Sequence, residues 1–198
     1  MVRHWTLGAG YELQNTNYLL YTYGHMIFRK ITKLPFDREY FMALLSGSEG
    51  GLATTSAIAA GLLISTSDRN VVIVTASISF IVQAFNSAIN RFSAEHTSDE
   101  IDHEDVLNGY RKPIMNATMQ FIAHIVMGLL VLLPIIYVDN TASAMLISIG
   151  VTLALMFLLG LYKGYVVGTR AIDDGLEQLG LGAIVISVGI LAGYVLAW

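Results

Sequence analysis

One carboxylate, Glu49, lies inside a long apolar stretch and is flanked by Gly47, Gly50 and Gly51. An ionisable side chain at membrane depth is costly, and such residues commonly mark the path of an ion or substrate. The hydroxyl of Thr54 follows five positions later, and a carboxylate beside hydroxyls suits a hard or borderline cation. We predict Glu49 as the principal ligand of a transported cation. The alternative is a carboxylate near the cytoplasmic end of its helix that is only hydrated or paired.

A second apolar stretch carries Gln83, Asn86 and Asn90 at steps of three and four residues. This spacing places the three amides on one face of a helix. Amides can coordinate a partly dehydrated cation, but they also bond neighbouring helices in membranes. Gln83 and Asn86 are therefore predicted, together with Thr54, as secondary cation contacts, and helix packing is the other interpretation.

A third apolar stretch carries Asn116, Gln120 and His124 at steps of four. His124 is the one histidine in the apolar stretches, and methionines lie beside it in the sequence. An imidazole with thioether neighbours could bind a softer metal or relay protons, and His124 is predicted as a further secondary cation contact. A histidine that is simply hydrogen-bonded between helices would give the same pattern.

The segment between the second and third apolar stretches is rich in metal-ligating side chains. If the preceding helix continues into it, carboxylates and imidazoles share helical faces at ligand spacing. This cluster is predicted to recruit metal, although a solvated acidic turn would have the same composition. Its members are Glu95, His96, Asp99, Glu100, Asp102, His103, Glu104 and Asp105.

The composition shows what kind of protein must position these side chains. Of the 198 residues 55% are hydrophobic and 13% charged, with a mean hydropathy of +0.60, which is outside the range of a soluble domain. The basic residues are scattered, which excludes a nucleic-acid surface. Without cysteine, any metal site must use carboxylate, imidazole, thioether or amide groups. No catalytic triad, metal-hydrolase motif or phosphate-binding glycine loop is present, so we expect neither an enzyme nor a tightly bound cofactor.

Five apolar stretches are long enough to cross about 30 Å of hydrocarbon as helices. The sequence thus predicts an all-α integral membrane protein with five transmembrane helices in a domain over residues 39–198. The stretches cover approximately residues 40–66, 71–94, 114–138, 142–167 and 176–198, with an acidic connection over residues 95–112.

The basic residues predict the orientation, because lysine and arginine in short loops stay in the cytoplasm. With the N-terminus in the cytoplasm, only Arg69 lies on the far side, and the C-terminus is outside. The cytoplasmic set comprises Arg3, Arg29, Lys30, Lys33, Arg38, Arg91, Arg111, Lys112, Lys163 and Arg170.

Residues 1–38 lack the pattern of a signal peptide, since polar residues interrupt them early. Aromatic and aliphatic residues mixed with Arg29, Lys30 and Lys33 predict an interfacial helix on the cytoplasmic leaflet. A disordered arm, or one that binds a protein partner through residues 1–40, is the alternative.

Glycines at four-residue spacing predict close contact between helices, and are compatible with a dimer. They are Gly47 with Gly51, Gly160 with Gly164 and Gly168, and Gly189 with Gly193.

Several stretches together resemble the vacuolar iron transporter family, five-helix proteins that move ferrous iron or manganese. "GSEGGLATTSAIAAGL" is similar to that family's first helix, with Glu49 where the family usually has aspartate. "SAINRFSAEHTSDE" is similar to the end of its second helix. Its third, fourth and fifth helices resemble "GLLVLLPII", "LMFLLGLYKGYVVGTR" and "GLEQLGLGAIVISVGILAGYVL".

The resemblance implies a homodimer with a pore between the subunits that exchanges Fe²⁺ or Mn²⁺ for protons, in a cell membrane or a vacuolar-type membrane. Two departures stand out. Ser87 replaces a methionine of the family, and Asn90-Arg91-Phe92 replaces a Gly-Glu-Tyr or Gly-Glu-Phe triplet. The long glutamate-rich domain between helices two and three is also missing. We expect metal export from the cytoplasm, or alternatively an accessory membrane subunit that has lost transport.

Overall fold

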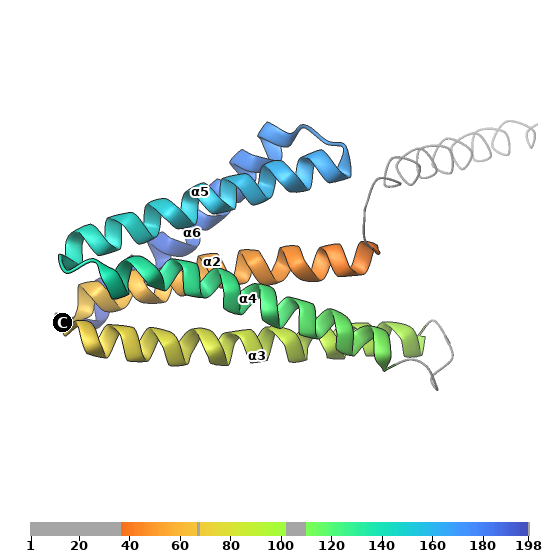
Figure 1. The fold of residues 1–198 in the computed structure, drawn as a ribbon, viewed down its shortest axis with the longest axis horizontal. Helices are drawn as coiled ribbons and strands as arrows, with labels where there is room; N and C mark the ends of the chain where they lie inside the picture. Colours follow the sequence, from red (N-terminus) through yellow and green to blue (C-terminus); the bar gives the residue numbers. More distant parts are fainter. Residues whose placement is uncertain (1–36, 67, 102–109, 198) are drawn as a thin grey trace, which may run out of the picture.

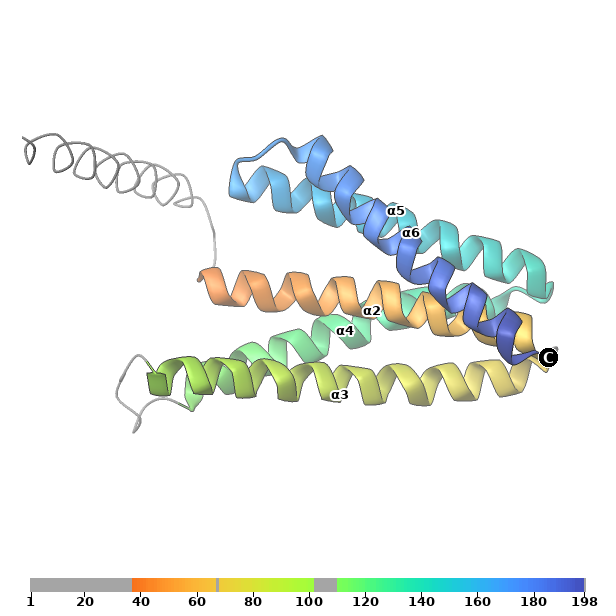
Figure 2. The ribbon, with the colours of Figure 1, turned by 180° about the vertical axis from the view of Figure 1, so that it is seen from behind.

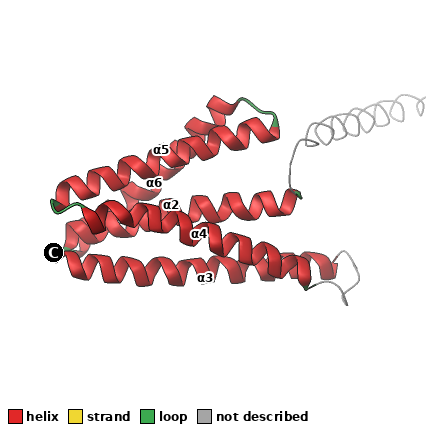
Figure 3. Cartoon of the chain, viewed as in Figure 1, coloured by secondary structure: helices red, strands yellow, loops and turns green. Residues whose placement is uncertain are grey.

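Five long helices lie side by side along the long axis of the molecule in the computed structural model, which describes residues 37–66, 68–101 and 110–197 (Figures 1 and 3). No strand occurs in these ranges, so the predicted all-α class is confirmed. The helices are α2 (Arg38–Ser65), α3 (Arg69–Ile101), α4 (Arg111–Tyr137), α5 (Thr141–Val167) and α6 (Ala171–Leu196).

Each helix covers one of the five apolar stretches. The α3 helix continues to Ile101, past the predicted end of its stretch at residue 94, so the start of the acidic connection is helical. The predicted interfacial helix lies almost wholly outside the described residues, as do His103 and Glu104.

The α2 helix is central and contacts all four of the others. In Figures 1 and 2, α5 and α6 lie on one side of α2 and α3 lies on the other, while α4 crosses between α3 and α5. The buried face of α2 consists largely of glycine, alanine, serine and threonine, which permit close backbone approach between membrane helices. The charged and amide side chains of α2 and its neighbours are thereby brought within reach of one another.

Four helices, α3 to α6, are long and apolar enough to cross a membrane. The chain is accordingly a multi-pass membrane protein. The α2 helix, although 28 residues long, lacks such an apolar stretch because Glu49 and many small polar residues lie in its middle. Most of its surface faces other helices rather than lipid, so it needs less hydrophobicity than they do. We therefore still expect α2 to be the fifth span.

The close contacts predicted from glycine spacing occur at three helix pairs. Gly47 and Gly51 lie against the backbone of α4, and Gly189 and Gly193 lie against the backbone of α2. Gly160 and Gly164 of α5 lie against α6, and a Cβ added at either position would collide with backbone atoms of α6. The remaining member, Gly168, serves another purpose: its φ of 80° ends α5 in a left-handed turn.

Arg69 joins the start of α3 to the end of α4. Its Nε donates to the carbonyl of Ile135 at 2.9 Å and its Nη2 to that of Ile136 at 2.5 Å. These carbonyls belong to the last turn of α4, where a cation is favourable. Nη1 also lies 3.2 Å from Oδ1 of the exposed Asp139. The far-side arginine predicted from sequence is thus a helix cap.

Candidate functional site

Glu49 is half-buried on α2 and is bound by an amide from another helix. Nε2 of Gln178, on α6, donates to Oε1 of Glu49 at 2.6 Å. Gln178 is only 4% exposed, so the bond is well shielded from solvent. Glu49 forms no ion pair with any described residue; Lys163 attracts it and Glu177 repels it only over longer distances. Its carboxylate therefore has a neutral partner and a second oxygen that can take a further ligand.

Thr54 lies one turn beyond Glu49 and shares a groove with Gln83. The hydroxyl of Thr54 donates to the carbonyl of Gly50 at 2.5 Å. The lone pairs of the hydroxyl oxygen therefore remain able to coordinate a cation. The groove has a volume of about 370 Å³, lies between α2, α3 and α6, and is otherwise mostly apolar. Two predicted secondary contacts are thus brought together along one surface of the chain.

The amides of α3 are not all on that surface. Gln83 is partly buried in the groove, whereas Asn86 and Asn90 are exposed on the outside of α3. None of the three amides donates a hydrogen bond to a described residue. Asn86 and Asn90 therefore face whatever surrounds the chain, either lipid or a second protein.

The polar residues of α4 share one face, as their spacing predicted, and this face is buried. Asn116, Gln120 and His124 are 0%, 6% and 2% exposed. Their side chains face α2 and α3. Both ring nitrogens of His124 lack a hydrogen-bond partner among the described residues. A Cβ added at Gly50 would lie 3.1 Å from Nδ1 of His124, so the imidazole packs directly on the glycine that follows Glu49.

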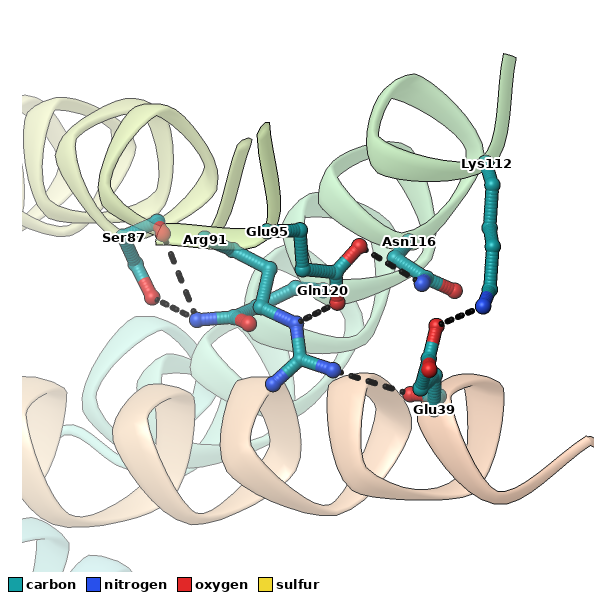
Figure 4. A network of polar contacts seen from close by, with 7 residues as sticks. All are labelled: Glu39, Ser87, Arg91, Glu95, Lys112, Asn116 and Gln120. Carbon is teal, nitrogen blue, oxygen red and sulfur yellow. Dashed lines mark hydrogen bonds and ion pairs between the residues drawn. The ribbon is translucent and has the colours of Figure 1, made fainter. Parts of the chain in front are cut away.

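Two charged pairs connect α2, α3 and α4 at the predicted cytoplasmic end (Figure 4). On α3, the guanidinium of Arg91 forms an ion pair with Glu95, one turn further along. Nζ of Lys112 lies 2.7 Å from Oε2 of Glu39. Nη2 of Arg91 also donates to the backbone carbonyl of Glu39 at 3.2 Å, which joins the two pairs.

Glutamine and asparagine side chains of α4 extend this network. Nδ2 of Asn116 donates to Oε2 of Glu95 at 2.7 Å. Nε2 of Gln120 donates to Oγ of Ser87 at 2.5 Å. Both carboxylate oxygens of Glu95 are consequently engaged within the chain.

The predicted metal-recruiting cluster is therefore only partly assembled in the described residues. Glu95 is directed into the network, while His96 and Glu100 lie 3.4 Å apart on another face of α3. Asp99 is partly buried and Glu100 is exposed. Within the described ranges no three histidine or acidic side chains are close enough to hold one metal ion.

Sequence reasoning missed Gln178, the partner of Glu49. Its signal was present, because Gln178 is a polar residue within an apolar stretch, next to glycines that predict close packing. Spacing along one helix could not indicate that α6 would lie against α2 at this level.

The model of the VIT family matches residues 77–194, which is more than half of the chain and runs from within α3 to the last turn of α6. The matched range does not include α2 or Glu49. No curated protein matches the chain.

Proposed function

The chain belongs to the VIT family, the vacuolar iron transporters, and from this premise we propose that it carries Fe²⁺ or Mn²⁺ out of the cytoplasm. Glu49 is the principal ligand in this proposal, with Thr54 and Gln83 as secondary contacts. Membership of a transporter family is compatible with a protein that is not an enzyme. Its cargo is a substrate that passes through the protein, rather than a resident cofactor.

The observation that carries the proposal is the environment of the Glu49 carboxylate. It is a half-buried carboxylate in a membrane protein, and its described partner is the neutral Gln178 rather than a lysine or arginine. A carboxylate in this position is stabilised by access to water or by a cation. Oxygen ligands of this kind suit Mn²⁺ and Fe²⁺.

A homodimer is the proposed assembly, with the pore between two copies. Two features support it: the groove that contains Thr54 and Gln83 is open, and Asn86 and Asn90, on the same helix as Gln83, are exposed. Two such surfaces facing each other would line a pore with hydroxyls and amides. Exchange of metal for protons is the proposed coupling, with the buried imidazole of His124 as the proposed proton carrier.

Mn²⁺ flux into proteoliposomes tests this function. Glu49→Gln keeps the size of the side chain but removes its charge, and we expect a loss of flux of at least about tenfold, equivalent to about 1.4 kcal/mol. The matched control is Asp139→Asn, which neutralises an exposed carboxylate at the opposite end of the molecule. Both variants should remain folded.

Equal flux through Glu49→Gln and the parent would contradict the assigned path. No flux through the parent, together with copurification of a stoichiometric partner bound through residues 1–40, would favour the accessory-subunit function.

A further inference from the structure

Lys163 lies on α5 between a residue that contacts α2 and a residue that contacts α6. The residue before it, Tyr162, places its ring centroid 6.0 Å from that of Phe41 on α2. The residue after it, Gly164, lies against the backbone of Ala171 on α6. Successive side chains of an α-helix point about 100° apart. The partly buried side chain of Lys163 therefore extends between these two contacts, toward the junction of α2, α5 and α6.

The preceding turn of α5 lies level with Glu49. Leu159 packs against two buried clusters, one containing Leu45 and the other containing Leu52, which lie on either side of Glu49 along α2. Lys163 follows Leu159 by four residues and shares its helical face. The long side chain of Lys163 thus starts about one turn from the level of the carboxylate, on the neighbouring helix.

The charged groups around this junction leave Glu49 as the counterpart of Lys163. Asp174 accepts a hydrogen bond from the hydroxyl of Thr169, and Glu177 is exposed. Neither Lys163 nor Glu49 forms an ion pair with a described residue. The ammonium nevertheless attracts the Glu49 carboxylate from beyond contact distance. The junction thus holds a half-buried anion and a partly buried cation that do not touch.

The ammonium acts on Glu49 in opposite ways in the empty and the loaded site. In the empty site it stabilises the carboxylate, which is costly at membrane depth without a cation or water. Gln178 donates to Oε1, which leaves Oε2 of Glu49 to bind a divalent cation. A cation held there would be repelled by the ammonium, because charges interact more strongly in a protein interior than in water. Lys163 therefore favours the empty site over the loaded one.

We propose that Lys163 sets the affinity of the Glu49 site: its ammonium is a tethered counter-cation that competes with the transported divalent cation and promotes its release. This inference rests on the proposed function, in which Glu49 is the principal ligand. Conduction requires that an ion bind well enough to enter and weakly enough to leave. Lys163 supplies the second of these conditions.

The test uses Lys163→Met, which keeps the length of the side chain and removes its charge. Equilibrium Mn²⁺ binding is measured on the full-length protein in detergent, and Mn²⁺ flux is measured in proteoliposomes over a range of concentrations. We expect Mn²⁺ to bind at least about fivefold more tightly, because a repelling charge is lost. The concentration for half-maximal flux should fall, and maximal flux should fall with it, since the ion leaves more slowly. A merely structural role would lower maximal flux without tightening binding.

Two further variants serve as controls. Lys163→Arg retains the positive charge and should bind Mn²⁺ as the parent does. Arg170→Gln removes a positive charge from the same end of the molecule, but this side chain is 89% exposed and its charge is screened by solvent. Its Mn²⁺ affinity should change by less than about twofold. If Lys163→Met does not fold, Lys163→Gln takes its place in every measurement.

A second measurement needs no metal. Without Mn²⁺, Lys163→Met should lower the melting temperature of the parent, because the carboxylate loses its cation. It should not lower that of Glu49→Gln, in which no carboxylate remains. This comparison reports on the pair even if Glu49→Gln leaves Mn²⁺ flux unchanged, which is the outcome that contradicts the proposed function.

Three results would overturn the proposal. One is unchanged or weaker Mn²⁺ binding in both Lys163→Met and Lys163→Gln. Another is an equal gain of affinity in Arg170→Gln, which would assign the effect to surface charge in general. The third is an equal change of melting temperature by Lys163→Met with and without the Glu49 carboxylate, because the two residues would then act independently.

Discussion

Replacing His124 by leucine tests whether this histidine is present for function or for packing. The side chain is 2% exposed, and neither ring nitrogen has a partner among the described residues. Polar groups that stabilise a protein are normally hydrogen-bonded when they are buried. We therefore expect His124→Leu to raise the free energy of unfolding while reducing metal flux.

The magnitude follows from the two nitrogens. A neutral imidazole has one donor and one acceptor, and each costs about 1–3 kcal/mol when buried without a partner. Leucine removes both groups and has a similar size, but its branched end must fit against Gly50 and Gly51, at a cost of roughly 1–3 kcal/mol. The expected net effect is a stabilisation of about 1–3 kcal/mol.

Unfolding by SDS in mixed micelles measures the stability, and Mn²⁺ flux in proteoliposomes measures the function. Thr152→Val is the matched control, because Thr152 is equally buried but its hydroxyl donates to the carbonyl of Ser148 at 2.9 Å. Losing this satisfied bond should lower stability by about 0.5–1 kcal/mol. The two substitutions to apolar residues are thus expected to change stability in opposite directions.

A His124→Leu variant that is destabilised by more than about 1 kcal/mol and transports normally would refute this reasoning. The imidazole would then be a packing residue with a hydrogen-bonded neighbour, which is the alternative interpretation of its sequence.

Three further substitutions test other parts of the structure. Arg69→Ala should lower the free energy of unfolding by about 2–4 kcal/mol, since two carbonyls lose a charged donor. Asp139→Ala should lower it by less than about 1 kcal/mol because that carboxylate is fully exposed. Equal effects of the two substitutions would mean that the ion pair dominates. Gly51→Ala should lower the free energy of unfolding by about 1–3 kcal/mol because the added Cβ collides with α4. A Cβ added at Gly150 meets nothing within 4 Å, so Gly150→Ala should be neutral or stabilising in the same SDS titration. Gln178→Leu removes a bond to the half-buried carboxylate of Glu49 that is worth about 1.5–3 kcal/mol, so Mn²⁺ flux should fall by about tenfold or more. Unchanged flux would show that this bond does not position the ligand.

The number and approximate places of the helices in the described ranges could be predicted from hydropathy because most of their surface is apolar. The exception is informative. The α2 helix is the one of the five that lacks a stretch apolar enough to count as a span, and it is enclosed by the other four; a hydropathy scale measures suitability for lipid rather than for a protein interior. Its glycine spacing, rather than its hydropathy, indicated the close contacts it makes.

The candidate site could be predicted only one helix at a time. Four-residue spacing placed Asn116, Gln120 and His124 on one face of α4, and the structure shows that this face is buried. The same reasoning grouped Gln83 with Asn86, but only Gln83 is partly covered, because periodicity identifies a shared face and not its neighbour.

The spacing of residues along one helix could not predict which residues of other helices they contact. The partner of Glu49 lies 129 residues away, on α6. Arg91 could be recognised from sequence as a departure from the family's carboxylate, but its pairing with Glu95 became apparent only from the structure.

The most direct test of the central claim is a crystal structure of the full-length protein soaked in Mn²⁺, with anomalous scattering recorded to locate the metal. We predict an anomalous peak within about 2.0–2.6 Å of a carboxylate oxygen of Glu49, the range of oxygen ligands around hard divalent cations. Manganese peaks at other positions, with none in contact with Glu49, would contradict its assignment as the principal ligand.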